Sequence, residues 1–279
     1  MLRQRVITAV VLLALLLPAL FAASPLPFAL LTLVMIGAAG WEWARLNGLA
    51  RPVAAWGLGI LVAGLCAASL VSLPQVGQWP WLWRGATLCW MVGGALALKV
   101  GPGGWPQTPP ALRWVMGVAL LWLAWLALAQ ARVIGVNFLL SILCIVWAAD
   151  ISAYFCGRAF GKRKLAPSIS PGKSWEGVYG GVAGVLLLAV GWLWLDAHHS
   201  LDSPSVFLLI QQRLGGVGLL LASLLLAALS VMGDLFESLV KRAAGAKDSS
   251  ALLPGHGGVL DRVDALLPVL PAALALVSL

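Results

Sequence analysis

The sequence predicts an all-α integral membrane protein, a polytopic bundle of about nine transmembrane helices. Of its 279 residues, 61% are hydrophobic and only 10% are charged, whereas an ordinary soluble domain is about 25% charged. The apolar residues form long runs and do not alternate with a period of two, which disfavours a β-barrel. Helices satisfy their own backbone hydrogen bonds, as a lipid environment requires of every spanning segment. The composition therefore excludes a water-soluble fold.

Nine apolar segments are each long enough to cross about 30 Å of hydrocarbon. Residues 1–24 resemble a secretory signal peptide, but a retained first helix fits better because further helices follow. We expect helices at 6–23, 26–44, 53–73, 82–100, 111–130, 133–155, 177–195, 213–233 and 263–279.

Basic residues predict the orientation of these helices. A cytoplasmic N-terminus places fifteen of the eighteen Lys and Arg residues on the inner side, as the positive-inside rule requires. We therefore expect the C-terminus outside. The net charge of +8 then reflects cytoplasmic loops near anionic headgroups, and it does not indicate a nucleic-acid partner. The four cysteines lack CxxC spacing, so we interpret them as packing residues.

Acidic residues are distributed unevenly along the chain. Residues 1–130 contain one, Glu42, and the other nine lie within 150–264. We interpret 1–130 as a scaffold of transmembrane helices. We interpret 131–279 as the catalytic region, with cytoplasmic loops at 156–176 and 234–262.

Carboxylates gather between Gly233 and Asp264 at the predicted cytoplasmic mouth of the bundle. Asp261 and Asp264 are three residues apart, hence on one face if the last helix begins there. With Asp234 they suit a Mg²⁺ site, because Mg²⁺ prefers one or two carboxylates plus waters and phosphates. Salt bridges to the neighbouring basic residues are the alternative interpretation.

A glycine-rich turn, Pro254–Gly258, lies between these carboxylates. Its glycines permit left-handed backbone angles, and its N–H groups can form an anion nest at a helix start. An ordinary flexible turn is the alternative interpretation. His256 is an acid, a phosphate donor or a structural imidazole.

A second polar segment runs from Ser168 to Gly177. Its Gly-Lys-Ser resembles a P-loop, but Pro167 occupies a position where that motif needs glycine and no strand precedes it. We expect a phosphate-binding loop in which Ser170 caps a helix, Pro171 enters its first turn and Lys173 supplies charge. A plain capped helix start is the alternative.

Asp150 lies about one turn inside a predicted span, and Tyr154 shares its helix face. A buried carboxylate there is costly without a partner, so it predicts a functional site.

These segments together resemble the phosphatidate cytidylyltransferase (CDP-diacylglycerol synthase) family. Residues 238–264 read Ser-x-Val-Lys-Arg-x₄-Lys-Asp-x-Ser-x₂-Leu-Pro-x-His-Gly-Gly-Val-x-Asp-Arg-Val-Asp, which matches the full family signature. The stretches Gly233–Glu237, Ser170–Gly177 and Asp150–Gly157 also resemble the family. One departure is Ala265, where the family has Ser.

The resemblance implies a homodimer of nine-helix chains with a polar cavity open to the cytoplasm of a bacterial inner membrane. It implies a two-metal centre with Mg²⁺ and, as a candidate second cation, K⁺, held by Asp234 and Asp261. The implied reaction converts CTP and phosphatidate to CDP-diacylglycerol and diphosphate in phospholipid biosynthesis. Expected catalytic residues are Asp234, Lys247, Asp248, His256, Asp261, Arg262 and Asp264. Expected substrate-binding residues are Asp150, Tyr154, Ser170, Lys173, Ser174, Lys241, Arg242, Gly257 and Gly258.

Two other classes of function remain open at this point. One is another CTP-using membrane enzyme, such as a polyprenol kinase or a cytidylyltransferase acting on an archaeal-type lipid. The other is an anion transporter or channel. Labelled CTP separates the enzymes, because a kinase transfers the γ-phosphate and a cytidylyltransferase leaves CMP on the lipid.

Overall fold

Helices make up nearly all of the structure. The computed structural model describes residues 2–49, 51–73 and 79–279, and its strands within those ranges are two short ones. The elements are α1 (Leu2–Phe21), α2 (Leu26–Leu46), α3 (Pro52–Ser69), the 3-10 turn η1 (Leu70–Ser72), α5 (Pro80–Cys89), the π-helical turn η2 (Trp90–Gly94), α6 (Ala95–Gly104), the 3-10 turn η3 (Trp105–Gln107), α7 (Pro110–Ile134), α8 (Val136–Phe160), β1 (Lys164–Ala166), β2 (Ser170–Ser174), α9 (Trp175–His198), α10 (Val206–Ala243), α11 (Leu260–Val263) and α12 (Leu266–Val277).

Prolines and a serine mark where several helices begin. Pro52, Pro80 and Pro110 open α3, α5 and α7, at positions where a missing backbone N–H costs nothing. Ser205 caps α10, since its side chain accepts a hydrogen bond from the N–H of Leu208.

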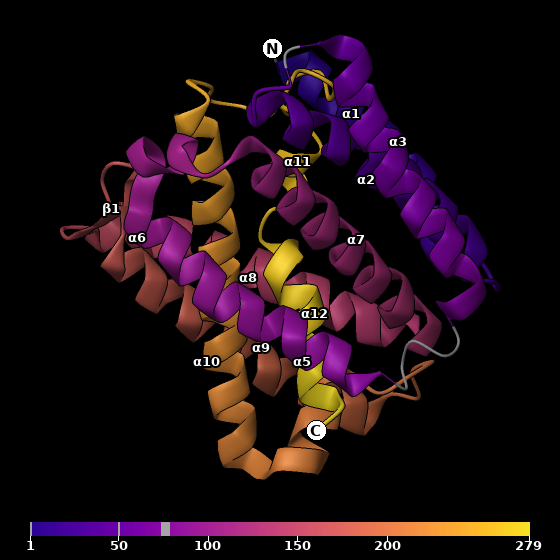
Figure 1. The fold of residues 1–279 in the computed structure, drawn as a ribbon. Helices are drawn as coiled ribbons and strands as arrows, with labels where there is room; N and C mark the ends of the chain where they lie inside the picture. Colours follow the sequence, from indigo (N-terminus) through magenta and orange to yellow (C-terminus); the bar gives the residue numbers. More distant parts are fainter. Residues whose placement is uncertain (1, 50, 74–78) are drawn as a thin grey trace.

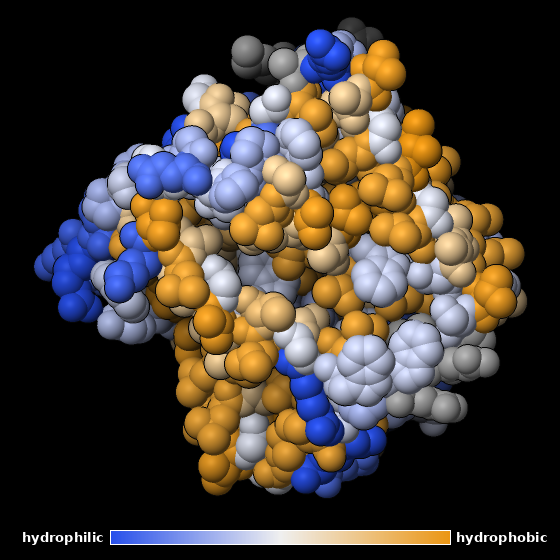
Figure 2. Space-filling view, in the orientation of Figure 1, coloured by the Kyte–Doolittle hydropathy of each residue, from blue (hydrophilic) through white to orange (hydrophobic). Residues whose placement is uncertain are grey.

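Seven helices in the described ranges are long and apolar enough to cross a membrane: α1, α2, α3 with η1, α7, α8, α9 and α10. Their outward faces are apolar, and Figure 2 shows hydrophobic residues over most of the visible side of the molecule. The chain is therefore an all-α integral membrane protein, as predicted. The count of nine spans is not confirmed, because η2 separates α5 from α6 and α12 is only 12 residues long.

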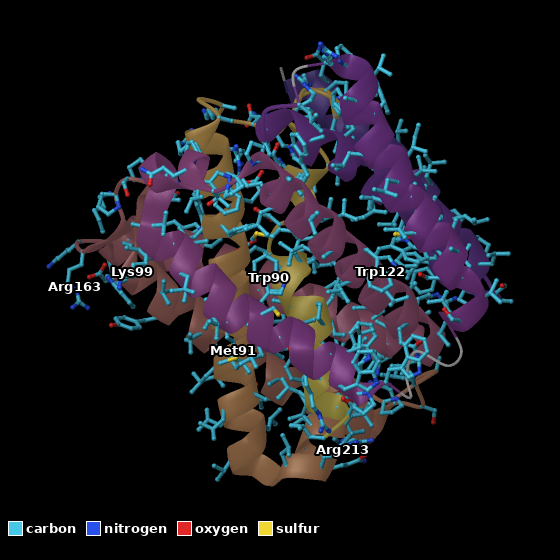
Figure 3. The ribbon with its side chains drawn as sticks, viewed as in Figure 1. Trp90, Met91, Lys99, Trp122, Arg163 and Arg213 are labelled. Carbon is cyan, nitrogen blue, oxygen red and sulfur yellow. The ribbon has the colours of Figure 1, made fainter. Side chains whose placement is uncertain are left out.

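The short helix α12 lies in the middle of the bundle. It packs against α10, α5 and α7, and ten of its residues are buried. Around it, α8 pairs with α9 and α2 pairs with α3 (Figure 1). Figure 3 shows Trp122 of α7 at the boundary with α3, where its indole N–H donates to Ser69. The two chain ends lie at opposite ends of the view in Figure 1.

The largest difference from the predicted elements is in α10. We expected a helix over 213–233, but α10 continues to Ala243, with a bend at Gly215. The extension is helical because Leu235, Phe236, Leu239 and Val240 form a buried apolar stripe with helical spacing. Hydropathy alone ends the segment at the first charge, so the boundary at 233 was wrong.

Candidate active site

A cavity of about 570 Å³ opens between α8, the β1–β2 hairpin, α9 and α10. Six residues that the sequence analysis selected lie on its wall. They are Asp150 and Tyr154 from α8, Ser170, Lys173 and Ser174 from β2, and Asp234 from α10. Segments that are distant in the sequence thus meet around one polar cavity.

The hairpin brings Ser170 and Lys173 to this cavity. Strands β1 and β2 pair antiparallel, and Glu176 holds the preceding turn by accepting from the N–H groups of Lys162 and Arg163. Figure 3 shows Arg163 projecting from the left side of the molecule, beside β1. The expectation that Ser170 caps a helix with Pro171 in its first turn was wrong, because both residues lie in β2.

Ser174 takes the capping role instead. It precedes α9, and its side chain accepts a hydrogen bond from the N–H of Gly177. Strand pairing decided this difference, since residues 170–174 find backbone partners in β1 and helix α9 then begins at the next serine.

Lys173 and Asp234 form an ion pair on the wall of the cavity. The Lys173 Nζ lies 2.6 Å from Asp234 Oδ2, and each side chain is about a quarter exposed, at 26% and 28%. Asp150 lies close enough for its charge to interact with both groups. A lysine near two carboxylates on the wall of this cavity is well placed to meet an incoming phosphate.

A second lysine, Lys241, lies deeper in the same region. Its Nζ is 2.5 Å from Glu237 Oε2 and 2.6 Å from Asp261 Oδ1. Glu237 is 1% exposed, and its Oε1 has no hydrogen-bond partner among the residues that the structure describes. Lys241 thus joins α10 to α11 and partly compensates two buried carboxylates.

Asp261 accepts four hydrogen bonds. Oδ1 accepts from Lys241 Nζ, and Oδ2 accepts from the N–H and the hydroxyl of Ser249 and from the N–H of Gly258. The four donor–acceptor distances are 2.6 to 3.0 Å. Burial raises the pKa of Asp261, but the ammonium of Lys241 and the N–H donors outweigh it and lower the pKa to about 2. This carboxylate therefore stays ionised throughout the physiological range.

The glycine-rich turn folds as the sequence predicts in one respect. Gly255 and Gly257 have φ of 77° and 84°, the left-handed region that favours glycine. Gly258 donates its N–H to Asp261 Oδ2, and His256 accepts from Arg262 through its carbonyl. The imidazole Nδ1 of His256 is buried and has no hydrogen-bond partner within the described part of the chain. Two N–H groups of the turn that were expected in an anion nest are engaged within the protein: His256 donates to the carbonyl of Leu253, and Gly258 donates to the carboxylate of Asp261.

Asp264 connects the cavity to the buried pair. It lies close enough for its charge to interact with Asp234, Lys173 and Lys241. The linked network has five acidic groups, Asp150, Asp234, Glu237, Asp261 and Asp264, and two lysines, Lys173 and Lys241. This excess of carboxyl groups attracts cations, which is the chemistry expected of a metal-dependent phosphate site.

The match to known proteins is extensive. The model of the cytidylyltransferase family matches residues 3–279. The chain belongs to the cytidylyltransferase family. It is 41% identical to a phosphatidate cytidylyltransferase of Pseudomonas aeruginosa, with 99% of this chain and 97% of the relative covered. A protein of the same name from Haemophilus influenzae is 36% identical, with 97% and 96% covered. The family predicted from the signature is thereby confirmed.

Ten of the sixteen predicted site residues of this cytidylyltransferase-family chain do not line the cavity, and four of these ten also lie outside the carboxylate network and the glycine-rich turn. Arg242 donates to the carbonyls of Ile169 and Ala246, and Lys247 and Asp248 are exposed on the following loop. Arg262 lines a separate, mostly apolar cavity of about 170 Å³ between α1, α2, α7 and α8. The roles assigned to these four residues stay predictions.

Two buried acids were missed as site residues. Glu237 lies in the network described above, and Glu42 of α2 is fully buried against the signature segment. A signal was available for both, because an acidic residue within a membrane helix is costly and needs a partner. Glu42 is the one acidic residue of the first 130, and its isolation there was interpreted only as a mark of scaffold.

Proposed function

We propose that this chain transfers the cytidylyl group of CTP to phosphatidate, forming CDP-diacylglycerol and diphosphate. The observation behind the proposal is the 570 Å³ cavity, where Lys173 and Asp234 form an ion pair beside Asp150 within a chain of mostly membrane-spanning helices. A polar, cation-attracting cavity in an apolar bundle suits a reaction between a water-soluble nucleotide and a lipid. Family membership and the names of the relatives support the same substrates.

In the reaction, a phosphate oxygen of phosphatidate attacks the α-phosphorus of CTP. The new P–O bond forms as the bond from the α-phosphorus to the bridging oxygen breaks, and diphosphate leaves with that electron pair. The attacking phosphate is already anionic near neutral pH, so the site needs no strong general base. The difficulty is to bring two polyanions together, and positioning and charge neutralisation should dominate.

Lys173 and Lys241 supply positive charge on two sides of the carboxylates. Lys173 lines the open cavity. Its ammonium can leave the ion pair with Asp234 and bind a substrate phosphate instead. Lys241 is more deeply buried and orients Asp261. Ser170 and Tyr154 also line the cavity and offer hydroxyl donors to a phosphate or to the nucleotide.

The carboxylates fit a divalent cation. In the described ranges no group of three or more His, Cys, Asp or Glu side chains already surrounds a metal position. Mg²⁺ needs only one or two protein carboxylates beside waters and substrate phosphates, and the network has more acidic than basic groups. Asp234 and Asp261 would hold Mg²⁺, with Asp264 beside them, and K⁺ is the proposed second cation. Bound Mg²⁺ would neutralise the triphosphate and stabilise charge in the in-line transfer.

The proposed location is a bacterial inner membrane, with the N-terminus and the site on the cytoplasmic side and the C-terminus outside. The distribution of basic residues supports this orientation. We also propose a homodimer, on the basis of the family resemblance. Cysteine accessibility in sealed vesicles tests the orientation, and native mass spectrometry in detergent tests the dimer.

The decisive experiment incubates the purified chain with phosphatidate, Mg²⁺ and [α-³²P]CTP, and separates the lipids by chromatography. We expect label in CDP-diacylglycerol. With [γ-³²P]CTP the lipid should stay unlabelled and the label should appear in diphosphate. Label transferred to lipid from the γ-position would identify a kinase, and no turnover at all would refute the proposal.

A further inference from the structure

Glu42 is a fully buried carboxylate in the half of the chain that resembled a scaffold. It lies on α2, is 0% exposed, and accepts four hydrogen bonds from residues more than 200 positions away in the sequence. Every donor belongs to the signature segment. One acidic side chain thus connects the N-terminal helices to the loop that precedes Asp261.

The four contacts are arranged symmetrically on the two oxygens. Oε1 receives the N–H of Val259 at 2.9 Å and the hydroxyl of Ser250 at 2.5 Å. Oε2 receives the N–H of Leu260 at 2.7 Å and the hydroxyl of Ser249 at 3.1 Å. Each oxygen therefore binds one backbone donor, which cannot rotate away, and one hydroxyl, which can.

Asp261 also accepts hydrogen bonds from this loop. It accepts from the N–H and the hydroxyl of Ser249 and from the N–H of Gly258. Gly258 lies between the two acids, where an added Cβ would collide with Ser249 Oγ and with Glu42 Oε1. Two carboxylates therefore bind this segment, and the single hydroxyl proton of Ser249, which lies within reach of both, is donated to one of them at a time.

We propose that Glu42 is a positioning residue for the reaction, which sets the place of Asp261 by holding the segment 249–260. The inference rests on the proposed function, because Asp261 is there assigned to the metal. Glu42 acts through the backbone N–H groups of Val259 and Leu260, directly before Asp261. Groups that orient a metal ligand in this way typically change metal affinity or activity by about 10- to 100-fold when lost.

Glu42→Gln tests this role with the least change in shape. The amide NH₂ of Gln would face the fixed N–H of Val259 or of Leu260, so one of these two backbone donors loses its acceptor in either orientation. Thr32→Val is the matched control. Thr32 is also buried on α2, donates to the carbonyl of Phe28 and accepts from Trp125. None of its hydrogen bonds with described residues involves the signature segment.

Two measurements on the purified chain decide the matter. Hydrogen exchange of the metal-free protein, followed by mass spectrometry, should show faster exchange in peptides covering 249–260 for Glu42→Gln and no change there for Thr32→Val. A Mg²⁺ titration, followed by thermal shift and by CDP-diacylglycerol formation, should show affinity weakened about 10- to 100-fold by Glu42→Gln. Thr32→Val should titrate as the wild type does.

Ser250→Ala provides a milder version, in case Glu42→Gln does not fold. It removes the hydroxyl that donates to Glu42 and that also accepts from the N–H of Leu252. Exchange is therefore compared in peptides covering 257–260, where it should rise about fivefold, the weight of one ordinary hydrogen bond. Unchanged exchange in the folded variant would overturn the proposal, as would a Mg²⁺ titration of Glu42→Gln equal to that of Thr32→Val. If wild-type chain made no CDP-diacylglycerol, the proposed function would fail, and the exchange data would still test the link between Glu42 and the loop.

Discussion

Lys173→Ala separates catalytic from structural roles in the cavity. The ion pair with Asp234 is short, at 2.6 Å, but both side chains are about a quarter exposed. Exposed pairs contribute about 0–1 kcal/mol to stability, so the variant should unfold close to the wild-type temperature. A charge-assisted hydrogen bond to a phosphate is worth about 1.5–3 kcal/mol, which corresponds to a loss of about 10- to 150-fold in kcat/KM.

The assay is CDP-diacylglycerol formation by purified protein in detergent, with thermal unfolding of the same sample. Lys164→Ala is the matched control, because Lys164 lies on the partner strand, is exposed and does not line the cavity. It should keep wild-type kinetics. Equal activity for the two variants would refute the assignment of Lys173 to a substrate phosphate. A large loss of thermal stability in Lys173→Ala would refute the view that this pair is structurally dispensable.

Three further predictions concern the signature segment and the distant end of the bundle. Asp261→Asn should abolish CDP-diacylglycerol formation while the protein still inserts. The same variant should lose about 1.5–3 kcal/mol of stability, because the NH₂ group of the new Asn would face Lys241 or the N–H groups of Ser249 and Gly258. Full activity at both limiting and saturating Mg²⁺ would contradict the metal assignment. Gly257→Ala should destabilise the fold by about 1–3 kcal/mol, measured by thermal unfolding, since φ is 84° and the added Cβ would lie 2.6 Å from Asp261 Oδ2; a wild-type melting temperature would show that the turn tolerates another conformation. Arg132→Met should lower stability with KM for CTP unchanged, because buried Arg132 donates to the carbonyls of Leu20 and Ala22, outside the cavity; a changed KM would show an unexpected link to the site.

Much of the fold follows from properties that can be counted along the chain. Each of the nine predicted spans coincides with one or more observed helices, because hydropathy and the length needed to cross a bilayer depend on short windows of sequence. The errors fall where backbone partners decide the structure. Ser170 and Pro171 suit a helix start, yet they pair with β1. Residues 234–243 are charged enough to end a hydropathy segment, yet their buried stripe continues α10.

The candidate site was predicted as a set of residue types, and only in part as an arrangement. Asp150, Lys173 and Asp234 were selected from three separate segments, and all three line one cavity. The motif could not reveal that Lys241 pairs with Asp261, or that Lys173 pairs with Asp234. By charge alone, either lysine could pair with either carboxylate. The distances between them in the folded chain decide which pairs form.

The sequence by itself determined the membrane environment, the approximate helices, the family and the acidic character of the site. These follow from composition and from local motifs, whose physical basis is short-range. Only the tertiary structure decided that Glu42 accepts hydrogen bonds from the signature loop, including one from Ser249, which lies 207 residues further along the chain. A buried carboxylate must find donors wherever the packed helices present them, and no local pattern in the sequence specifies which distant backbone N–H groups those are.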